Sequence, residues 1–325
     1  MALITFVVLF GCWAFIVRAA PRPVESRWIE GIYERKEEDA AALKGPKFVI
    51  VGGSGTHFSY SARILSEETG LPFINLGSHA GLGGEYILYR ARASLRPGDT
   101  VVLALEHQLL ADSAPSTVLT HFAITSDPMF LLHVSIAKIL PLAFGYSPVQ
   151  LVRQVSANSV PWNSPLYRAE TVDEFGDETV NVPGNKLPYM AQIVKELAPV
   201  WVGLPDPGHP PGYLVEFAGW AKEKNINLIQ AWPPTTYREA YNSAKYAAYF
   251  NRYSDVFAKL GFKPVGIQND FLIPEEDMLD SMYHADANGA ATASRALAVD
   301  LCRSIACLKK PSAQFSRETF LRHQH

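Results

Sequence analysis

The chain has 325 residues, of which 48% are hydrophobic, so it can form one large or two small folded domains, and disorder is excluded for most of its length. Its formal net charge is -3, which excludes the basic surface that a nucleic-acid backbone requires. Its three cysteines are too few for a disulfide framework.

The N-terminal segment, residues 1–20, begins with seventeen uncharged residues, MALITFVVLFGCWAFIV. This length lies between that of a membrane-spanning helix and that of the apolar part of a signal peptide. We expect an uncleaved membrane anchor, and a signal peptide cleaved near Ala20 is the alternative. Arg18, Arg22 and Arg27 all follow the segment, which is opposite to the positive-inside pattern for an exported domain.

A polar helix is expected within residues 21–45. Ser26–Leu43 is rich in charge, and Ile29, Ile32 and Tyr33 recur at helical spacing. We interpret this helix as a stem between the membrane segment and the folded domain. The alternative is that it is the first surface helix of the domain.

From Lys47 onward, short apolar runs alternate with helical patterns. The expected strands are Phe48–Val51, Pro72–Leu76, Thr100–Leu105, Val200–Gly203, Asn227–Trp232 and Pro264–Ile267. This alternation predicts an α/β domain, residues 46–308, with a parallel sheet of about five strands covered by helices on both faces. Residues 309–325 are expected to form a C-terminal tail.

Residues 111–188 interrupt the alternation and are expected to form an insertion over one edge of the sheet, as a lid or a docking surface. The apolar run Met129–Phe144 lies within it. Because this run contains His133, Lys138 and Pro141, we interpret it as a core or interfacial helix rather than a second membrane span.

Near the C-terminus, Cys302 and Cys307 lie on an expected helix that starts after Asn288. Five positions along a helix place two side chains about 140° apart, so we expect core thiols rather than a disulfide.

The turn after the first strand carries the most informative serine. Its sequence, GGSGTH, lacks the lysine of a phosphate-binding loop and the third glycine of a dinucleotide-binding fingerprint. Such a turn can instead expose a nucleophile, provided that a histidine and a carboxylate elsewhere assist it. Ser54 is therefore the candidate nucleophile, and the alternative role is a helix N-cap.

The late segment DSMYHADANG supplies the two assisting groups. His284 is the candidate general base and Asp280 the candidate carboxylate that orients it, with Asp277 and Asp286 as competitors. His57 and His79 have no partners at metal-ligand spacing, so neither a metal nor another cofactor is expected.

Together, these motifs resemble the SGNH, or GDSL-like, hydrolase superfamily over about Lys47–Cys307. GGS after the first strand is similar to the family's first block, NLGSHAGLG after the second strand to its second, and DSMYHADANG to its last. The resemblance implies a three-layer α/β/α fold and a catalytic triad of Ser54, His284 and Asp280.

The oxyanion hole is expected to use the backbone N–H of Ser54 and that of Gly77 or Gly81, since glycine permits close approach to a developing charge. The asparagine of the family's third block, a usual oxyanion donor, is absent from this chain. After the third strand, the sequence continues as ALEHQ, with Glu106 in the centre. Asn75 is the candidate substitute donor.

The last block also departs from the usual pattern, because Asp280 and His284 are four positions apart instead of three. This D-x-x-Y-H form resembles that of exported SGNH-like proteins that accompany membrane-bound O-acyltransferases, as in alginate acetylation and teichoic acid D-alanylation. It implies O-acyl transfer, most simply of acetyl, on an exported polysaccharide or cell-envelope glycan through an acyl-Ser54 intermediate.

The resemblance implies two partners, a glycan acceptor and a membrane-bound O-acyltransferase. It also implies attachment to the inner membrane with the domain facing the periplasm, or secretion if the first segment is cleaved. A secreted carbohydrate esterase or deacetylase is the alternative enzyme. A non-catalytic SGNH-like subunit of polysaccharide assembly is the alternative from another class.

Overall fold

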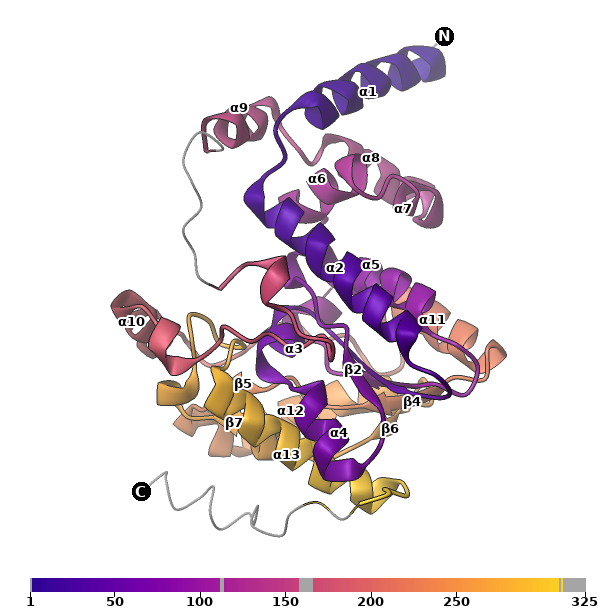
Figure 1. Cartoon of the computed structure of the whole chain (residues 1–325). Coiled ribbons are helices and arrows are strands. Elements are labelled where there is room, and N and C mark those ends of the chain that lie inside the picture. The colour runs from indigo at the N-terminus through magenta and orange to yellow at the C-terminus, as the bar shows by residue number, and fades with distance from the viewer. Residues whose placement is uncertain (1, 112–113, 158–165, 310, 312–325) are drawn as a thin grey trace.

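A five-stranded parallel sheet lies at the centre of the computed structural model, which describes residues 2–111, 114–157, 166–309 and 311 (Figure 1). The strand order is β2-β1-β3-β4-β6, and each neighbouring pair is parallel. The strands are β1 (Phe48–Val51), β2 (Phe73–Asn75), β3 (Thr100–Leu103), β4 (Asn227–Gln230) and β6 (Lys263–Pro264). The predicted parallel sheet of about five strands is confirmed. A separate small sheet pairs β5 (Thr235–Thr236) with β7 (Leu272–Ile273).

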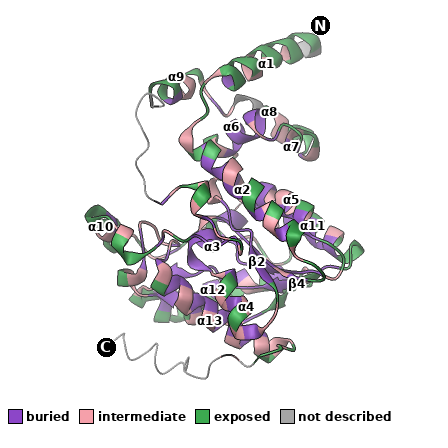
Figure 2. Cartoon of the chain, viewed as in Figure 1, coloured by how far each residue is buried: buried purple, intermediate pink, exposed green. Residues whose placement is uncertain are grey.

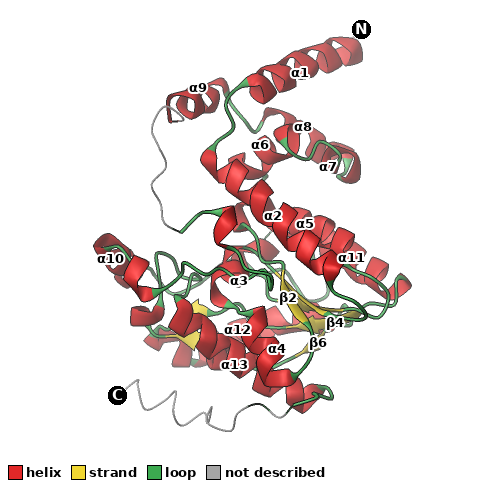
Figure 3. Ribbon diagram, viewed as in Figure 1, coloured by secondary structure: helices red, strands yellow, loops and turns green. Residues whose placement is uncertain are grey.

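Helices cover both faces of the sheet (Figure 3). α4 (Ala62–Thr69) connects β1 to β2, and α5 (Gly83–Ala91) connects β2 to β3 in the opposite direction, so right-handed crossovers place them on opposite faces. α4 packs against α13 (Ala287–Ser304), and α5 packs against α11 (Gly212–Glu223). α12 (Ala244–Ala258) crosses from β4 to β6 on the same face as α5. The chain therefore forms a three-layer α/β/α fold.

The predicted strand Val200–Gly203 is wrong, because this segment joins no sheet. The N–H of Val200 donates to the hydroxyl of Tyr241 at 2.8 Å, and the N–H of Val202 donates to that of Tyr249 at 3.4 Å. The tyrosine hydroxyls thus accept hydrogen bonds from backbone N–H groups that, in a strand, would donate to a neighbouring strand. A short apolar run does not reveal such partners.

The first two helices are α1 (Ala2–Ala19) and α2 (Val24–Ala42). Within the described residues, no single helix is both long and apolar enough to cross a membrane; α1 from Ile4 and α2 meet these criteria only as a pair that bends by 85°. α2 lies against the α/β fold, where it buries Trp28, Ile29 and Ile32 in the main core. It therefore contributes directly to the packing of the domain.

The described part of the insertion contains four α-helices, then a segment that returns to the sheet, and then a fifth α-helix. They are α6 (Thr117–Thr125), α7 (Phe130–His133), α8 (Ile136–Phe144), α9 (Pro148–Ala157) and α10 (Pro188–Glu196), while residues 112–113 and 158–165 lie outside the described part. The apolar run is thus two helices, because Val134 and Ser135 take extended conformations between them. Figure 1 shows α7, α8 and α9 beyond α2, away from the sheet. The returning chain meets the sheet edge, where the N–H of Asn75 donates to the carbonyl of Phe175 at 2.9 Å.

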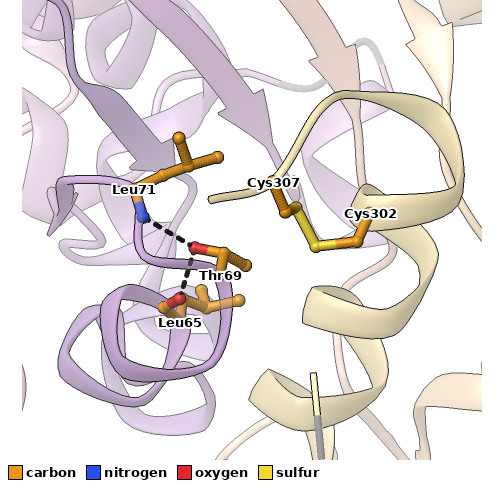
Figure 4. Close-up of a disulfide and its surroundings, with 5 residues drawn as sticks. All are labelled: Leu65, Thr69, Leu71, Cys302 and Cys307. Atoms are coloured by element: carbon orange, nitrogen blue, oxygen red, sulfur yellow. Dashed lines mark hydrogen bonds between the residues drawn. A yellow bond between two sulfur atoms is a disulfide. The ribbon is translucent and has the colours of Figure 1, made fainter. Parts of the chain in front are cut away.

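The prediction of free thiols near the C-terminus is wrong, because Cys302 and Cys307 form a disulfide (Figure 4). α13 ends at Ser304, so Cys307 lies beyond the helix and the angular argument does not apply to it. After the helix, the chain turns toward α4, where the N–H groups of Leu308 and Lys309 both donate to the carbonyl of Thr69. The expected tail, residues 309–325, lies outside the described part from residue 312 onward.

The disulfide can be tested by counting thiols. In denaturant without reductant, we expect alkylation of Cys12 alone, because it is the free cysteine; after reduction, all three cysteines should react. Intact-mass measurement of the alkylated chain distinguishes the two states. Closing so short a loop should stabilise the fold by about 2 kcal/mol. Alkylation at Cys302 or Cys307 before reduction would contradict the pairing.

Candidate active site

The candidate nucleophile lies where the direction of the strand connections reverses. Ser54 follows β1, and Glu106 lies just beyond β3, the neighbouring strand. The chain leaves β1 toward β2 but leaves β3 toward β4, on the other side. In open α/β sheets, ligands bind outside the carboxyl ends of the strands at such a reversal.

Ser54 is the first residue of the short helix α3, Ser54–Ser59. Gly53 takes the N-cap position without a side-chain capping bond, so the hydroxyl of Ser54 does not act as the cap. Ser54 is partly exposed, and in the described part of the chain neither its hydroxyl nor its backbone N–H has a recorded hydrogen-bond partner. Both groups are available to a substrate.

Glu106 holds the turn that carries Ser54. Its buried carboxylate accepts the N–H of Gly53 at 3.0 Å and that of Gly55 at 2.7 Å. A side chain on Gly53 would place its Cβ 2.5 Å from a Glu106 oxygen, so this close approach requires glycine. Burial raises the pKa of Glu106, although the two N–H groups favour the carboxylate form. The residues on either side of Ser54 are thus fixed, while its own N–H remains available.

The sequence placed Glu106 at a strand end but did not indicate that its carboxylate holds the serine turn. The position of Glu106 relative to the strands could have indicated this role. The carboxyl ends of adjacent parallel strands lie at the same edge of a sheet, so a carboxylate just after β3 can reach the N–H groups of the turn after β1.

The structure brings together the predicted base and its orienting carboxylate. The Nδ1 atom of His284 lies 2.7 Å from Oδ1 of Asp280, and the hydroxyl of Tyr167 donates to Oδ2 of the same carboxylate at 2.9 Å. A proton on Nδ1 would donate to Asp280 and leave Nε2 as the acceptor that a general base requires. Tyr167 is a residue that sequence reasoning missed, because no local pattern links it to the last block.

The electrostatics and the bonding of the nearby carboxylates favour Asp280 as the orienting group. Burial raises the pKa of Asp280, but the hydrogen bond and charge of His284 outweigh this effect and hold the pKa below its usual value. Asp286 instead caps α13 by accepting the N–H groups of Asn288 and Gly289. Burial raises the pKa of Asp277, and the side chain of Asn288 partly offsets this effect. Neither competitor is bonded to His284 in the described structure.

Helix α3 carries Ser54 at one end and holds the His284 segment near the other. The hydroxyl of Ser59 donates to the carbonyl of Tyr283 at 2.6 Å and accepts the N–H of Ala285 at 2.8 Å. The ring of Phe58, also on α3, lies 4.7 Å from that of His284. The structure has no hydrogen bond between Ser54 and His284. In enzymes without bound substrate, the hydrogen bond between nucleophile and base is often long and shortens when substrate binds.

Residues 75–83, which carry the second sequence block, form a loop beside the serine turn, called here the second-block loop. The oxyanion donors predicted in this loop have hydrogen-bond partners within the protein. Asn75 uses its amide NH₂ for the carbonyls of Thr56 and Tyr60, and its amide oxygen accepts the N–H of Gly77 at 2.8 Å. The N–H of Gly81 donates to Nδ1 of His79 at 2.9 Å. Asn75, Gly77 and Gly81 thus maintain the shape of the loop in this state.

A different N–H in this loop is available. A Cβ built on Gly53 would lie 2.9 Å from the Cα atom of Ala80, so the loop approaches the serine turn closely at this residue. In the described residues, no acceptor is recorded for the N–H of Ala80. Ala80 is therefore a candidate partner for the N–H of Ser54 in binding an oxyanion.

A buried lysine on α2 supports the same loop. The Nζ atom of Lys36 donates to the carbonyl of Gly77 at 2.6 Å and lies 2.8 Å from Nδ1 of His57, whose Nε2 lies 3.3 Å from Glu178. Burial lowers the pKa of Lys36 to about 7 and that of His57 to about 4. His57 is therefore neutral at pH 7 and can accept from Lys36 while it donates to Glu178. The helix interpreted as a stem thus supplies a support for the site.

The other histidines near the site have structural contacts. His107 is buried, its Nδ1 lies 3.2 Å from the hydroxyl of Tyr283, and burial lowers its pKa to about 3. His79 pairs with Glu25 on α2 at 3.0 Å. Among the described residues, no group of three or more His, Cys, Asp or Glu side chains could hold a metal ion.

Comparison of the chain with protein-family models, with curated proteins and with solved structures found no match.

Proposed function

We propose that the protein is an SGNH-like O-acyltransferase that moves an acyl group, most simply acetyl, to a glycan through an acyl-Ser54 intermediate. The observation that carries this proposal is the His284–Asp280 pair at 2.7 Å, attached through Ser59 to the helix that begins with Ser54. A nucleophile, a base and an orienting carboxylate from distant parts of the chain are the three groups that acyl transfer requires. The resemblance of the three sequence blocks supplies the reaction class.

In the first half-reaction, Oγ of Ser54 attacks the carbonyl carbon of an acyl donor, and its proton passes to Nε2 of His284. Asp280 stabilises the imidazolium that forms. The N–H groups of Ser54 and Ala80 donate to the oxyanion of the tetrahedral intermediate. The intermediate collapses, His284 returns the proton to the departing oxygen of the donor, and Ser54 carries the acyl group.

In the second half-reaction, a glycan hydroxyl replaces the donor. His284 takes the proton of this hydroxyl as its oxygen attacks the acyl carbon. The bond to Oγ of Ser54 then breaks, and His284 returns the proton to the serine. If water takes the place of the hydroxyl, the same residues perform ester hydrolysis, so the acceptor alone distinguishes the transferase from the alternative esterase.

We further propose that the domain works outside the cytoplasm, attached to the membrane by α1. Two features support this location. The segment before Arg18 carries no charge, and a disulfide joins Cys302 to Cys307. Stable disulfides form in oxidising compartments. A membrane-bound O-acyltransferase that passes the acyl group to Ser54 is the proposed partner.

The experiment that tests the function follows the loss of the acyl group from Ser54. The protein is first acetylated with an activated acetyl ester, and intact mass is then recorded over time with and without candidate glycans. We expect faster loss with a glycan acceptor and a matching gain of acetyl on that glycan. Rapid loss in water alone would identify an esterase. A chain that binds glycan but never acquires acetyl would leave the non-catalytic assembly role.

A further inference from the structure

Apolar side chains are exposed on three helices of the insertion. On α7 and α8 and at the residue before α7, Met129, Leu132, Ile136 and Leu140 are between 52% and 85% exposed. On α9, Val149, Val152 and Val155 are between 48% and 65% exposed. Figure 1 shows these three helices at one end of the molecule. Soluble proteins rarely expose large apolar patches without a partner.

These exposed positions follow the helical repeat. On α9, the three valines recur every third residue, while Gln154 of the same helix is buried. On α8, Ile136 and Leu140 are one turn apart, while Lys138 points to the domain and pairs with Glu85 at 2.6 Å. Both helices therefore have an apolar outer side. Their inner sides combine these polar contacts with apolar packing, through Leu142 of α8 and Leu151 of α9. An apolar side that faces outward is what a helix in a membrane interface requires.

The insertion packs against α1. Val17 of α1 is packed with Ile124 of α6 and Tyr146, between α8 and α9, in a small core of their own. Figure 1 shows α1, α7, α8 and α9 gathered at one end of the molecule, and in Figure 2 this end carries extensive exposed surface. α1 itself exposes Ile4 and Phe15 at 69% and 73%.

We propose that α7, α8 and α9 lie in the interface of a phospholipid bilayer beside α1, and together with it hold the catalytic domain at the membrane surface. The chemistry of the surface favours lipid over protein. Its exposed apolar side chains on α8 and α9 are aliphatic, whereas protein interfaces are enriched in the aromatic anchors tyrosine and tryptophan. Arg153 is exposed next to Val152 on α9, and Arg18 is exposed at the end of α1, so both can meet lipid phosphates.

This arrangement would link the membrane surface to the candidate site through α6. The start of α6 packs against the second-block loop, where the hydroxyl of Ser116 donates to the carbonyl of Gly81. At the start of α2, Ser26 bonds to His121 of α6 at 3.1 Å. The helices in the interface would thus set the distance between the second-block loop and the bilayer. Under the proposed function, this is the distance over which the site receives an acyl group from its membrane-bound partner.

The proposal is tested by placing a fluorescent label on the full chain in phospholipid vesicles. In a Cys12→Ser background, a single environment-sensitive label is attached at Ile136→Cys or at Val152→Cys. Val215→Cys on α11, where the native side chain is 45% exposed, is the matched control. Spin-labelled lipids then report contact with acyl chains, and aqueous iodide reports exposure to water.

We expect blue-shifted emission and quenching by shallow spin-labelled lipids at positions 136 and 152, because interfacial helices sit about 5–10 Å into the headgroup and acyl boundary. The control should be quenched by iodide only. Quenching of all three labels by iodide alone would overturn the proposal. Cross-linking of two copies of the chain through Ile136→Cys, without quenching by lipids, would also overturn the proposal. It would show that this surface is a protein interface.

Discussion

Replacement of Ser54 by alanine is expected to abolish the covalent acetylation of the protein by an activated acetyl ester. The hydroxyl of Ser54 is the atom that forms the bond, and no other group of the proposed triad can replace it. Intact mass should show a gain of one acetyl group in the parent chain, and peptide mapping should locate it on Ser54. The matched control is Ser135→Ala, at an exposed serine between α7 and α8. Acetylation of the Ser54→Ala chain at the parent rate would reject the nucleophile.

The other two residues of the triad should slow this step without preventing it. His284→Ala removes the general base, which contributes ~10²–10⁴-fold to the rate. Asp280→Asn should slow acylation by up to ~10⁴-fold, because the amide no longer holds the reactive tautomer of the imidazole. His209→Ala, at an exposed histidine, and Asp277→Asn, at a carboxyl not bonded to His284, are the controls. A larger loss for Asp277→Asn than for Asp280→Asn would move the orienting role to Asp277.

Replacement of Glu106 by alanine is expected to impair both folding stability and acylation. The change leaves the N–H groups of Gly53 and Gly55 buried without their acceptor, and each such loss costs about 1–3 kcal/mol. The turn that fixes Ser54 would also become free to move, so the acylation rate should fall more than the loss of folded protein explains. Urea unfolding and the rate of mass gain measure the two effects.

A graded pair of substitutions separates the role of Glu106 from a general loss of packing. Glu106→Gln keeps one oxygen and should retain one of the two bonds, so its effects should lie between those of the parent and of Glu106→Ala. Glu223→Ala, at an exposed position on α11, should change neither stability nor rate. If Glu106→Ala unfolds at the parent urea concentration and acylates at the parent rate, the carboxylate has no part in holding the turn.

The sequence left two roles open for α2, a stem between membrane and domain or the first surface helix of the domain. In the structure, its Lys36 is buried and donates to the carbonyl of Gly77. Tyr33 of the same helix donates to the hydroxyl of Ser78 at 2.8 Å. The helix that follows α1 is therefore in contact with the second-block loop, so α1 and that loop are joined by a short and ordered path.

Local sequence patterns were enough to predict the features that depend on neighbouring residues. The strands β1 to β4, the glycine turn at Ser54 and the pairing of Asp280 with His284 all follow from residues within a few positions of each other. Apolar runs of strand length and helical repeats report the periodicity of the backbone, and alternation of the two predicts a parallel sheet. The exact partners of each group were not contained in these patterns.

Contacts between groups far apart in the chain became visible in the folded structure. Glu106 bonds to a turn 53 and 51 residues before it, and Tyr167 reaches Asp280 across 113 residues. The bond between Asn75 and Gly77 is local, but whether it forms depends on the neighbours that enclose the loop. The disulfide depends on where α13 ends and the chain turns back. In each case the contact arises because packing of the elements brings the groups together, and a pattern along the chain carries no record of that packing.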